Sequence, residues 1–82
     1  MKARVYVSLK ETVLDPQGQT ICSALHSLGY EEVQDVRQGK YFEISLSNDL
    51  TPEQARERLA EIADRVLANP VIEEFRVELL EQ

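Results

Sequence analysis

Hydrophobic and polar residues alternate at the beginning of the chain. The hydrophobic members of this stretch are Ala3, Val5, Val7 and Leu9. A period of two places successive side chains on opposite faces, so we expect a β-strand with one buried and one open face. Similar patterns at residues 33–47 and 71–79 predict two more strands. Val33 is out of phase with the later hydrophobic residues of its segment, which predicts a bulge or bend near Gly39.

A helical pattern follows the first strand. Its apolar positions are Ile21, Ala24, Leu25 and Leu28, spaced as one face of an α-helix. Asp15 can cap the start of this helix, Pro16 suits its first position, and Gly29 is a natural stop. Gly18 is costly in a first helical turn, and this position either tolerates a crowded turn or allows another backbone or a ligand to approach closely.

A second helix is predicted to begin at Thr51, where Thr51, Pro52 and Gln54 match a capping box. Its apolar stripe comprises Ala55, Leu59, Ile62, Ala63, Val66 and Leu67. The dipeptide Asn69-Pro70 ends it.

These elements predict an α+β fold in the order β-α-β-α-β. We expect one domain, residues 1–82, with an antiparallel sheet, a bent or bulged central strand and both helices on one face. The opposite face is polar but carries Tyr6 and Tyr41, and tyrosine is enriched at protein interfaces. Because so short a chain has a small core, we expect Tyr6 and Tyr41 to mark a homo-oligomer interface, although a solvated face stays open.

Charge narrows the choice of partners. The chain has 15 acidic residues against 9 lysines and arginines, a net charge of −6. This balance argues against nucleic acid or an anionic membrane as the main partner. The single cysteine indicates a reducing compartment, and no signal peptide or membrane-spanning run is present. We therefore expect a cytoplasmic protein.

Candidate chemistry is sparse. Cys22 and His26 lie four residues apart, but a zinc site needs three or four ligands and a nucleophile–base pair needs an orienting third group. Gly39-Lys40 lacks the rest of a phosphate-binding loop. We predict no catalytic residue, no metal site and no cofactor bound by this chain.

Five short runs carry a resemblance to a known family. They are VYVSLK (5–10), VLDPQG (13–18), ALHSLG (24–29), VQDVRQGK (33–40) and LANPVIE (67–73). In this order they resemble the PurS family, the small subunit of the formylglycinamidine ribonucleotide synthase complex, over nearly the whole chain.

The resemblance implies a non-catalytic subunit in purine biosynthesis. It would bridge a PurQ-like glutaminase and a PurL-like synthetase, support ammonia transfer between them, and form dimers or tetramers. ATP and glutamine would be used by the other subunits of this ligase complex. The residues expected to contact these partners are Asp15, Gln17, Gly18, Arg37, Gly39, Lys40 and Asn69.

Other functions suit a similar fold. The main alternative is a small ferredoxin-like regulatory domain that binds a metabolite at a dimer interface. An acylphosphatase-type enzyme would need an arginine in the loop after the first strand, and residues 10–15 contain none. An RNA-binding module would need a basic surface.

Overall fold

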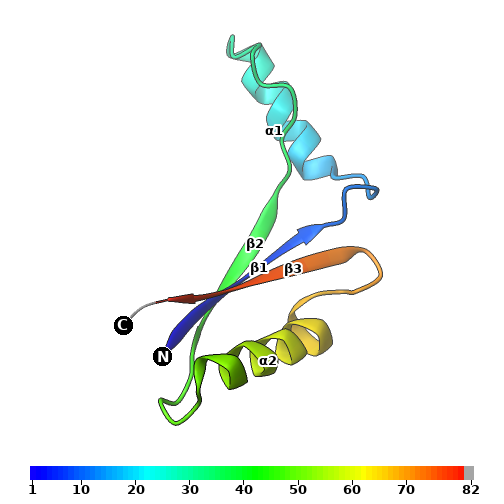
Figure 1. Ribbon diagram of the computed structural model, residues 1–82. Coiled ribbons are helices and arrows are strands. Elements are labelled where there is room, and N and C mark those ends of the chain that lie inside the picture. Colours follow the sequence, from blue (N-terminus) through cyan, green and yellow to red (C-terminus); the bar gives the residue numbers. More distant parts are fainter. Residues whose placement is uncertain (81–82) are drawn as a thin grey trace.

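The three predicted strands form one antiparallel sheet in a computed structural model that describes residues 1–80. They are β1 (Lys2–Leu9), β2 (Gly39–Ser45) and β3 (Glu73–Leu80), arranged in the order β2-β1-β3 (Figure 1). In the register, Val5 lies opposite both Phe42 and Val77. The α+β class and the β-α-β-α-β element order are therefore confirmed.

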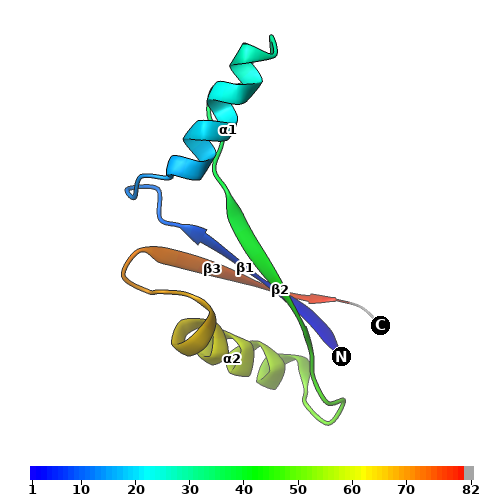
Figure 2. The same ribbon diagram turned by 180° about the vertical axis from the view of Figure 1, so that it is seen from behind.

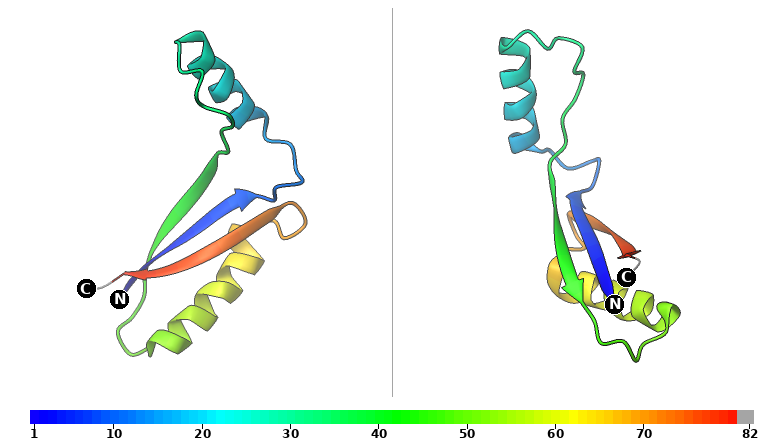
Figure 3. Two further views of the ribbon diagram at one scale, coloured as in Figure 1. Left: turned by 45° about the horizontal axis from the view of Figure 1, so that its top comes forward. Right: turned by 90° about the vertical axis from the view of Figure 1, so that its left-hand side faces the viewer.

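One helix, α2 (Pro52–Ile62), covers one face of this sheet, as the side view in Figure 3 shows. Ala55 and Leu59 of this helix are completely buried, as are Ala3 and Val5 of β1. Alternation along β1 thus places Ala3, Val5 and Val7 in the core, whereas Leu9 at the end of the strand is half-buried. Burial of a leucine of this kind stabilises a fold by about 2 kcal/mol.

The start of α2 is the predicted capping box. The Gln54 backbone N–H donates to the Thr51 hydroxyl at 3.2 Å, and the Thr51 N–H donates to Oε1 of Gln54 at 3.0 Å. The end of the helix differs from the prediction, because it widens into a π-helical turn, Ala63–Leu67. The extra residue in that turn changes the phase, and Val66 is 76% exposed instead of belonging to the buried stripe.

The first helix, α1 (Pro16–Ser27), has the predicted ends. Asp15 caps its start, and Gly29 follows its end with a φ of +97°. The Gly29 N–H donates to the His26 carbonyl and the Tyr30 N–H to the Leu25 carbonyl, each at 3.0 Å. This is the Schellman arrangement. It requires a left-handed backbone at the residue that follows the helix end, here Gly29, and glycine adopts that conformation most readily.

The position of α1 differs from the prediction. It extends beyond the end of the sheet instead of covering the same face as α2 (Figures 1 and 2). The molecule is therefore elongated, with extents of 51 × 29 × 14 Å. The core face is already occupied by α2, and the apolar stripe of α1 stays largely open, with Leu28 74% and Ile21 40% exposed. An apolar stripe indicates that a helix has a surface to bury, but not which surface covers it.

The predicted bulge near Gly39 is wrong for the sheet that forms. Pairing is one to one from Ser8–Gly39 to Lys2–Ser45, and residues 33–38 lie outside the strand. The phase change at Val33 therefore needs no bulge, because β2 begins only at Gly39. The φ of Gly39 is not positive, but an added Cβ would lie 2.8 Å from the Val7 carbonyl oxygen. A close approach to β1 is what favours glycine here.

Candidate functional site

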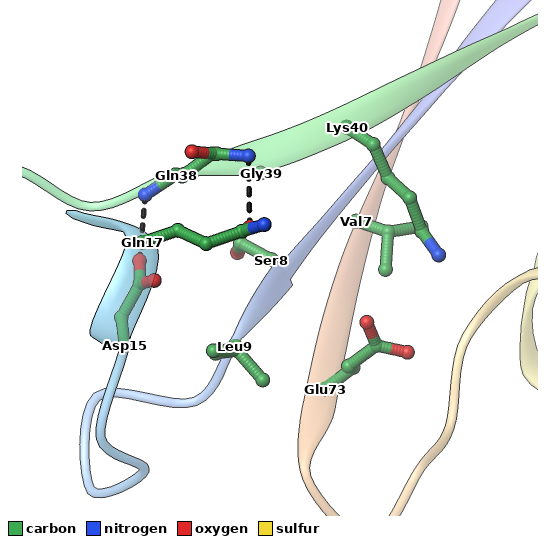
Figure 4. A pocket seen from close by; sticks show the side chains of 9 residues that line it. All are labelled: Val7, Ser8, Leu9, Asp15, Gln17, Gln38, Gly39, Lys40 and Glu73. Atoms are coloured by element: carbon green, nitrogen blue, oxygen red, sulfur yellow. Dashed lines mark hydrogen bonds between the residues drawn. The ribbon is translucent and has the colours of Figure 1, made fainter. Parts of the chain in front are cut away.

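Most of the predicted partner-binding residues gather at one end of the sheet. At this end β1 finishes, β2 and β3 begin, and α1 starts. A pocket of about 290 Å³ lies there (Figure 4). Its lining comprises Val7, Ser8, Leu9, Asp15, Gln17, Gln38, Gly39, Lys40 and Glu73. Four predicted residues, Asp15, Gln17, Gly39 and Lys40, are therefore brought together by the fold.

Asp15 is the best-buried polar residue of this end, at 4% exposure. Its carboxylate accepts the Gln38 N–H at 2.7 Å and the Gly18 N–H at 3.0 Å. The bond from Gln38, followed by the bond from Gly18, lowers the pKa of Asp15, and the nearby Arg37 charge acts in the same direction. The ionised carboxylate thus joins the start of α1 to the segment that enters β2.

Gly18 is buried beneath that segment. A Cβ at this position would overlap the Val36 carbonyl oxygen and would come within 2.8 Å of the Asp15 carboxylate. The glycine therefore permits close approach of another backbone, one of the two explanations that the sequence left open. It belongs to the structure beneath the pocket and does not line it.

Arg37 and Gln38 complete the connection between the two segments. The Arg37 guanidinium donates to the Lys10 and Val13 carbonyl oxygens, both at 3.0 Å. The Gln38 side-chain amide donates to Oε1 of Gln17 at 3.0 Å. Gln17, Arg37 and Gln38 are exposed, so their positions at the surface are set by bonds to neighbouring loops.

Lys40 and Glu73 lie across the pocket from Asp15 (Figure 4). The Lys40 ammonium is 5.7 Å from the centre of the Phe42 ring. Glu73 accepts the Asn69 N–H at 2.7 Å, and the Asn69 side chain in turn accepts the Val71 N–H at 3.1 Å. Asn69 therefore organises the turn before β3 and reaches the pocket only through Glu73.

The sequence did not single out Ser8, Gln38 or Glu73 as site residues. Ser8 and Glu73 reach the pocket because of the sheet register, which links residues far apart in the chain. Gln38 lies between Arg37 and Gly39, two predicted partner-binding residues in the run 33–40, so its position was the available signal.

Cys22 and His26 do not form a nucleophile–base pair. The Cys22 sulfur is 3.8 Å from Nε2 of His26, but that nitrogen is also 2.7 Å from the Val33 carbonyl oxygen. A carbonyl only accepts, so Nε2 carries a proton and cannot take one from the thiol. Within residues 1–80, no group of three or more His, Cys, Asp or Glu side chains could hold a metal ion.

Tyr6 and Tyr41 lie opposite each other on the sheet face away from α2, with ring centres 5.9 Å apart. Tyr41 is 56% exposed. The predicted grouping of these two rings is therefore present, and their role in an interface stays a prediction. Across the described part of the chain, no helix has the length and apolar character needed to cross a membrane.

Comparison with known proteins identifies relatives that match almost end to end. Residues 2–81 match the family model for PurS, phosphoribosylformylglycinamidine (FGAM) synthase. The phosphoribosylformylglycinamidine synthase subunit PurS of Bacillus subtilis is 49% identical over 80 residues, which covers 98% of this chain and 93% of the relative.

Solved structures give the same result. A B. subtilis PurS structure has a TM-score of 0.81 at 49% identity, with 98% of each chain covered. A chain in the structure of PurLQS from Thermotoga maritima has a TM-score of 0.75 at 30% identity, with 95% of each chain covered. This protein belongs to the PurS family.

Proposed function

We propose that this chain is a non-catalytic subunit of phosphoribosylformylglycinamidine synthase in de novo purine biosynthesis. It joins a PurL-like, ATP-dependent synthetase to a PurQ-like glutaminase and supports ammonia transfer between them. Family membership supports this role, as does the relative whose structure is that of PurLQS. The chain acts in the cytoplasm as a homo-oligomer and binds no cofactor itself, because ATP and glutamine are used by the other subunits.

The observation that carries this proposal is the polar end built around Asp15. The Asp15 carboxylate and the Arg37 guanidinium hold the helix start and two loops together. As a result, Gln17 and Lys40 are presented on a connected framework instead of on independent loops. A preformed surface of this kind loses little conformational entropy when a partner binds.

The internal bonding of this end disfavours the metabolite-binding alternative. Gln17 is already paired with Gln38, Glu73 with Asn69, and Asp15 with two backbone N–H groups. A small polar ligand would have to compete with these bonds. A protein partner can instead contact the outer surface and leave them intact.

Reconstitution tests the proposed role. Glutamine-dependent amidine formation by the synthetase and glutaminase should fall steeply without this chain, whereas ammonia-dependent formation should suffer less. Equal glutamine-dependent activity with and without the chain would rule out a bridging role.

A charge-reversal variant tests whether the polar end contacts the larger subunits. Lys40→Glu should weaken assembly with the larger subunits in a pull-down, because it reverses an exposed charge at the polar end. Arg56→Glu on α2 is the matched control, since it makes the same charge change at an exposed position on another element. Equal loss of assembly for both variants would argue for a general charge effect. Normal assembly with Lys40→Glu would place the contact elsewhere.

A further inference from the structure

The sheet face away from α2, here called the open face, is organised in four rows of three residues, one from each strand. The register gives the rows as Ser45–Lys2–Leu80, Glu43–Arg4–Glu78, Tyr41–Tyr6–Arg76 and Gly39–Ser8–Glu74. The first row holds one lysine, the second one arginine between two glutamates, the third one arginine and the fourth one glutamate. The formal charge therefore alternates in sign from each row to the next.

The side chains of the open face lie against one another. The Arg4 guanidinium is 3.5 Å from the Glu43 carboxylate and 5.6 Å from the centre of the Tyr41 ring. Arg76 lies 4.3 Å from the centre of the Tyr6 ring, and the Tyr6 hydroxyl donates to Glu78 at 3.2 Å. These contacts hold long side chains in place and reduce the entropy lost when a second surface covers them.

The open face is also electrically unlike the rest of the chain. It carries three basic and three acidic residues, so its net charge is zero. The chain as a whole has a net charge of −6, and the entire excess therefore lies elsewhere. Two copies of an acidic chain repel each other through most of their surfaces. Contact between two open faces avoids this repulsion, because each face has no net charge.

We propose that the open face packs against the same face of a second copy, with the twofold axis running across the strands between the Arg4 row and the Tyr6 row. This inference rests on the self-association included in the proposed function, and it specifies the surface and its symmetry. Rotation about this axis places each row over a row of opposite charge, because the order of the four rows is reversed. Each strand lies over its own counterpart, so Glu78 faces the second copy's Arg76, and Arg4 faces the second copy's Tyr6.

The alternative twofold axis, parallel to the strands, is unfavourable. It would place each row over the same row of the second copy, so rows of like net charge would face each other, with Lys2 over Lys2, Arg4 over Arg4 and Glu43 over Glu78. An axis across the strands instead satisfies the rule that a twofold interface is self-complementary. Sheets packed face to face deviate from exact alignment by about 30°, and contacts near the axis are displaced least.

Charge reversal at two facing positions tests this geometry. Arg76→Glu should place two carboxylates opposite each other, and Glu78→Arg should place two guanidinium groups opposite each other. Each variant alone should raise the dissociation constant of the homo-oligomer roughly tenfold or more, measured by sedimentation velocity at low salt. An equimolar mixture of the two should associate again, because opposite charges then face each other in both copies.

Recovered association in the mixture cannot come from a restored ion pair within one chain, because residues 76 and 78 carry the same charge in each variant. The matched control is the exposed pair of Glu61 on α2 and Arg65 in the π-helical turn that follows it, which are 3.7 Å apart. Glu61→Arg and Arg65→Glu should leave self-association unchanged. Circular dichroism melting of each variant verifies that the fold is retained.

Four results would overturn the inference in distinguishable ways. A monomeric wild type would remove the proposed self-association itself. Self-association of Arg76→Glu and Glu78→Arg at the wild-type level would place the interface on another surface. Loss of association without recovery in the mixture would exclude this twofold axis, and loss only of binding to the larger subunits would assign the open face to them.

Discussion

Gly18 offers a test in which local and tertiary effects predict opposite signs. It occupies the first turn of α1, where alanine is intrinsically favoured over glycine by about 1 kcal/mol. If only helix propensity mattered, Gly18→Ala would stabilise the protein. The structure instead places the Val36 carbonyl oxygen where the new Cβ would be.

The expected loss of stability in Gly18→Ala depends on which atoms must move to make room for the new Cβ. The obstacle is backbone, which cannot rotate away as a flexible side chain can, and the segment is held by the two bonds from Arg37. Forcing extra atoms into such a site costs about 1–3 kcal/mol, and the direct overlap argues for the upper part of that range. After the propensity gain is subtracted, we expect a net loss of about 1–2 kcal/mol.

The assay is equilibrium denaturation followed by circular dichroism, combined with hydrogen exchange at the Gln38 amide. Exchange at this amide should accelerate in Gly18→Ala, because displacement of the segment weakens its bond to Asp15. Gln19→Ala, at the next and exposed position, is the control and should change stability by less than about 0.5 kcal/mol. A more stable Gly18→Ala protein with unchanged exchange would refute the close approach.

Three further predictions concern other residues. Gly39→Val should lower stability by about 1–3 kcal/mol in thermal melting, because its Cβ would crowd the Val7 carbonyl oxygen; a melting temperature equal to wild type would show that β1 can move aside. Since the pKa of Asp15 is lowered in the folded state, its ionised form contributes stability above the unfolded pKa of about 4, and this contribution is lost as pH falls through the folded pKa. The difference in stability between wild type and Asp15→Asn should therefore be constant near neutral pH and shrink in acid, and a difference independent of pH would contradict it. The isolated chain should release neither ammonia from glutamine nor phosphate from ATP, and turnover abolished by Cys22→Ser or His26→Ala would disprove a non-catalytic role.

Features set by neighbouring residues were predictable from the sequence. The capping box at Thr51, the Asp15 cap and the glycine stop at Gly29 involve groups only a few residues apart. Such bonds depend on local geometry that any helix end provides. The alternation of β1 likewise predicted its buried face, because strand geometry places alternate side chains on opposite sides.

Only the tertiary structure decided how these elements meet. The apolar stripe of α1 predicted a helix with a surface to bury, yet α1 lies beyond the sheet because α2 already covers the core face (Figure 1). The hydrophobic pattern also did not predict the widened turn that exposes Val66 or the uninterrupted register of β2. Lys40 and Glu73 reach one pocket through strand pairing between distant segments, and Asp15 joins them through the bond that it accepts from the Gln38 N–H. Hydrophobic periodicity reports which side of an element avoids water, whereas the choice among possible partners depends on competition between distant surfaces, which no local pattern contains.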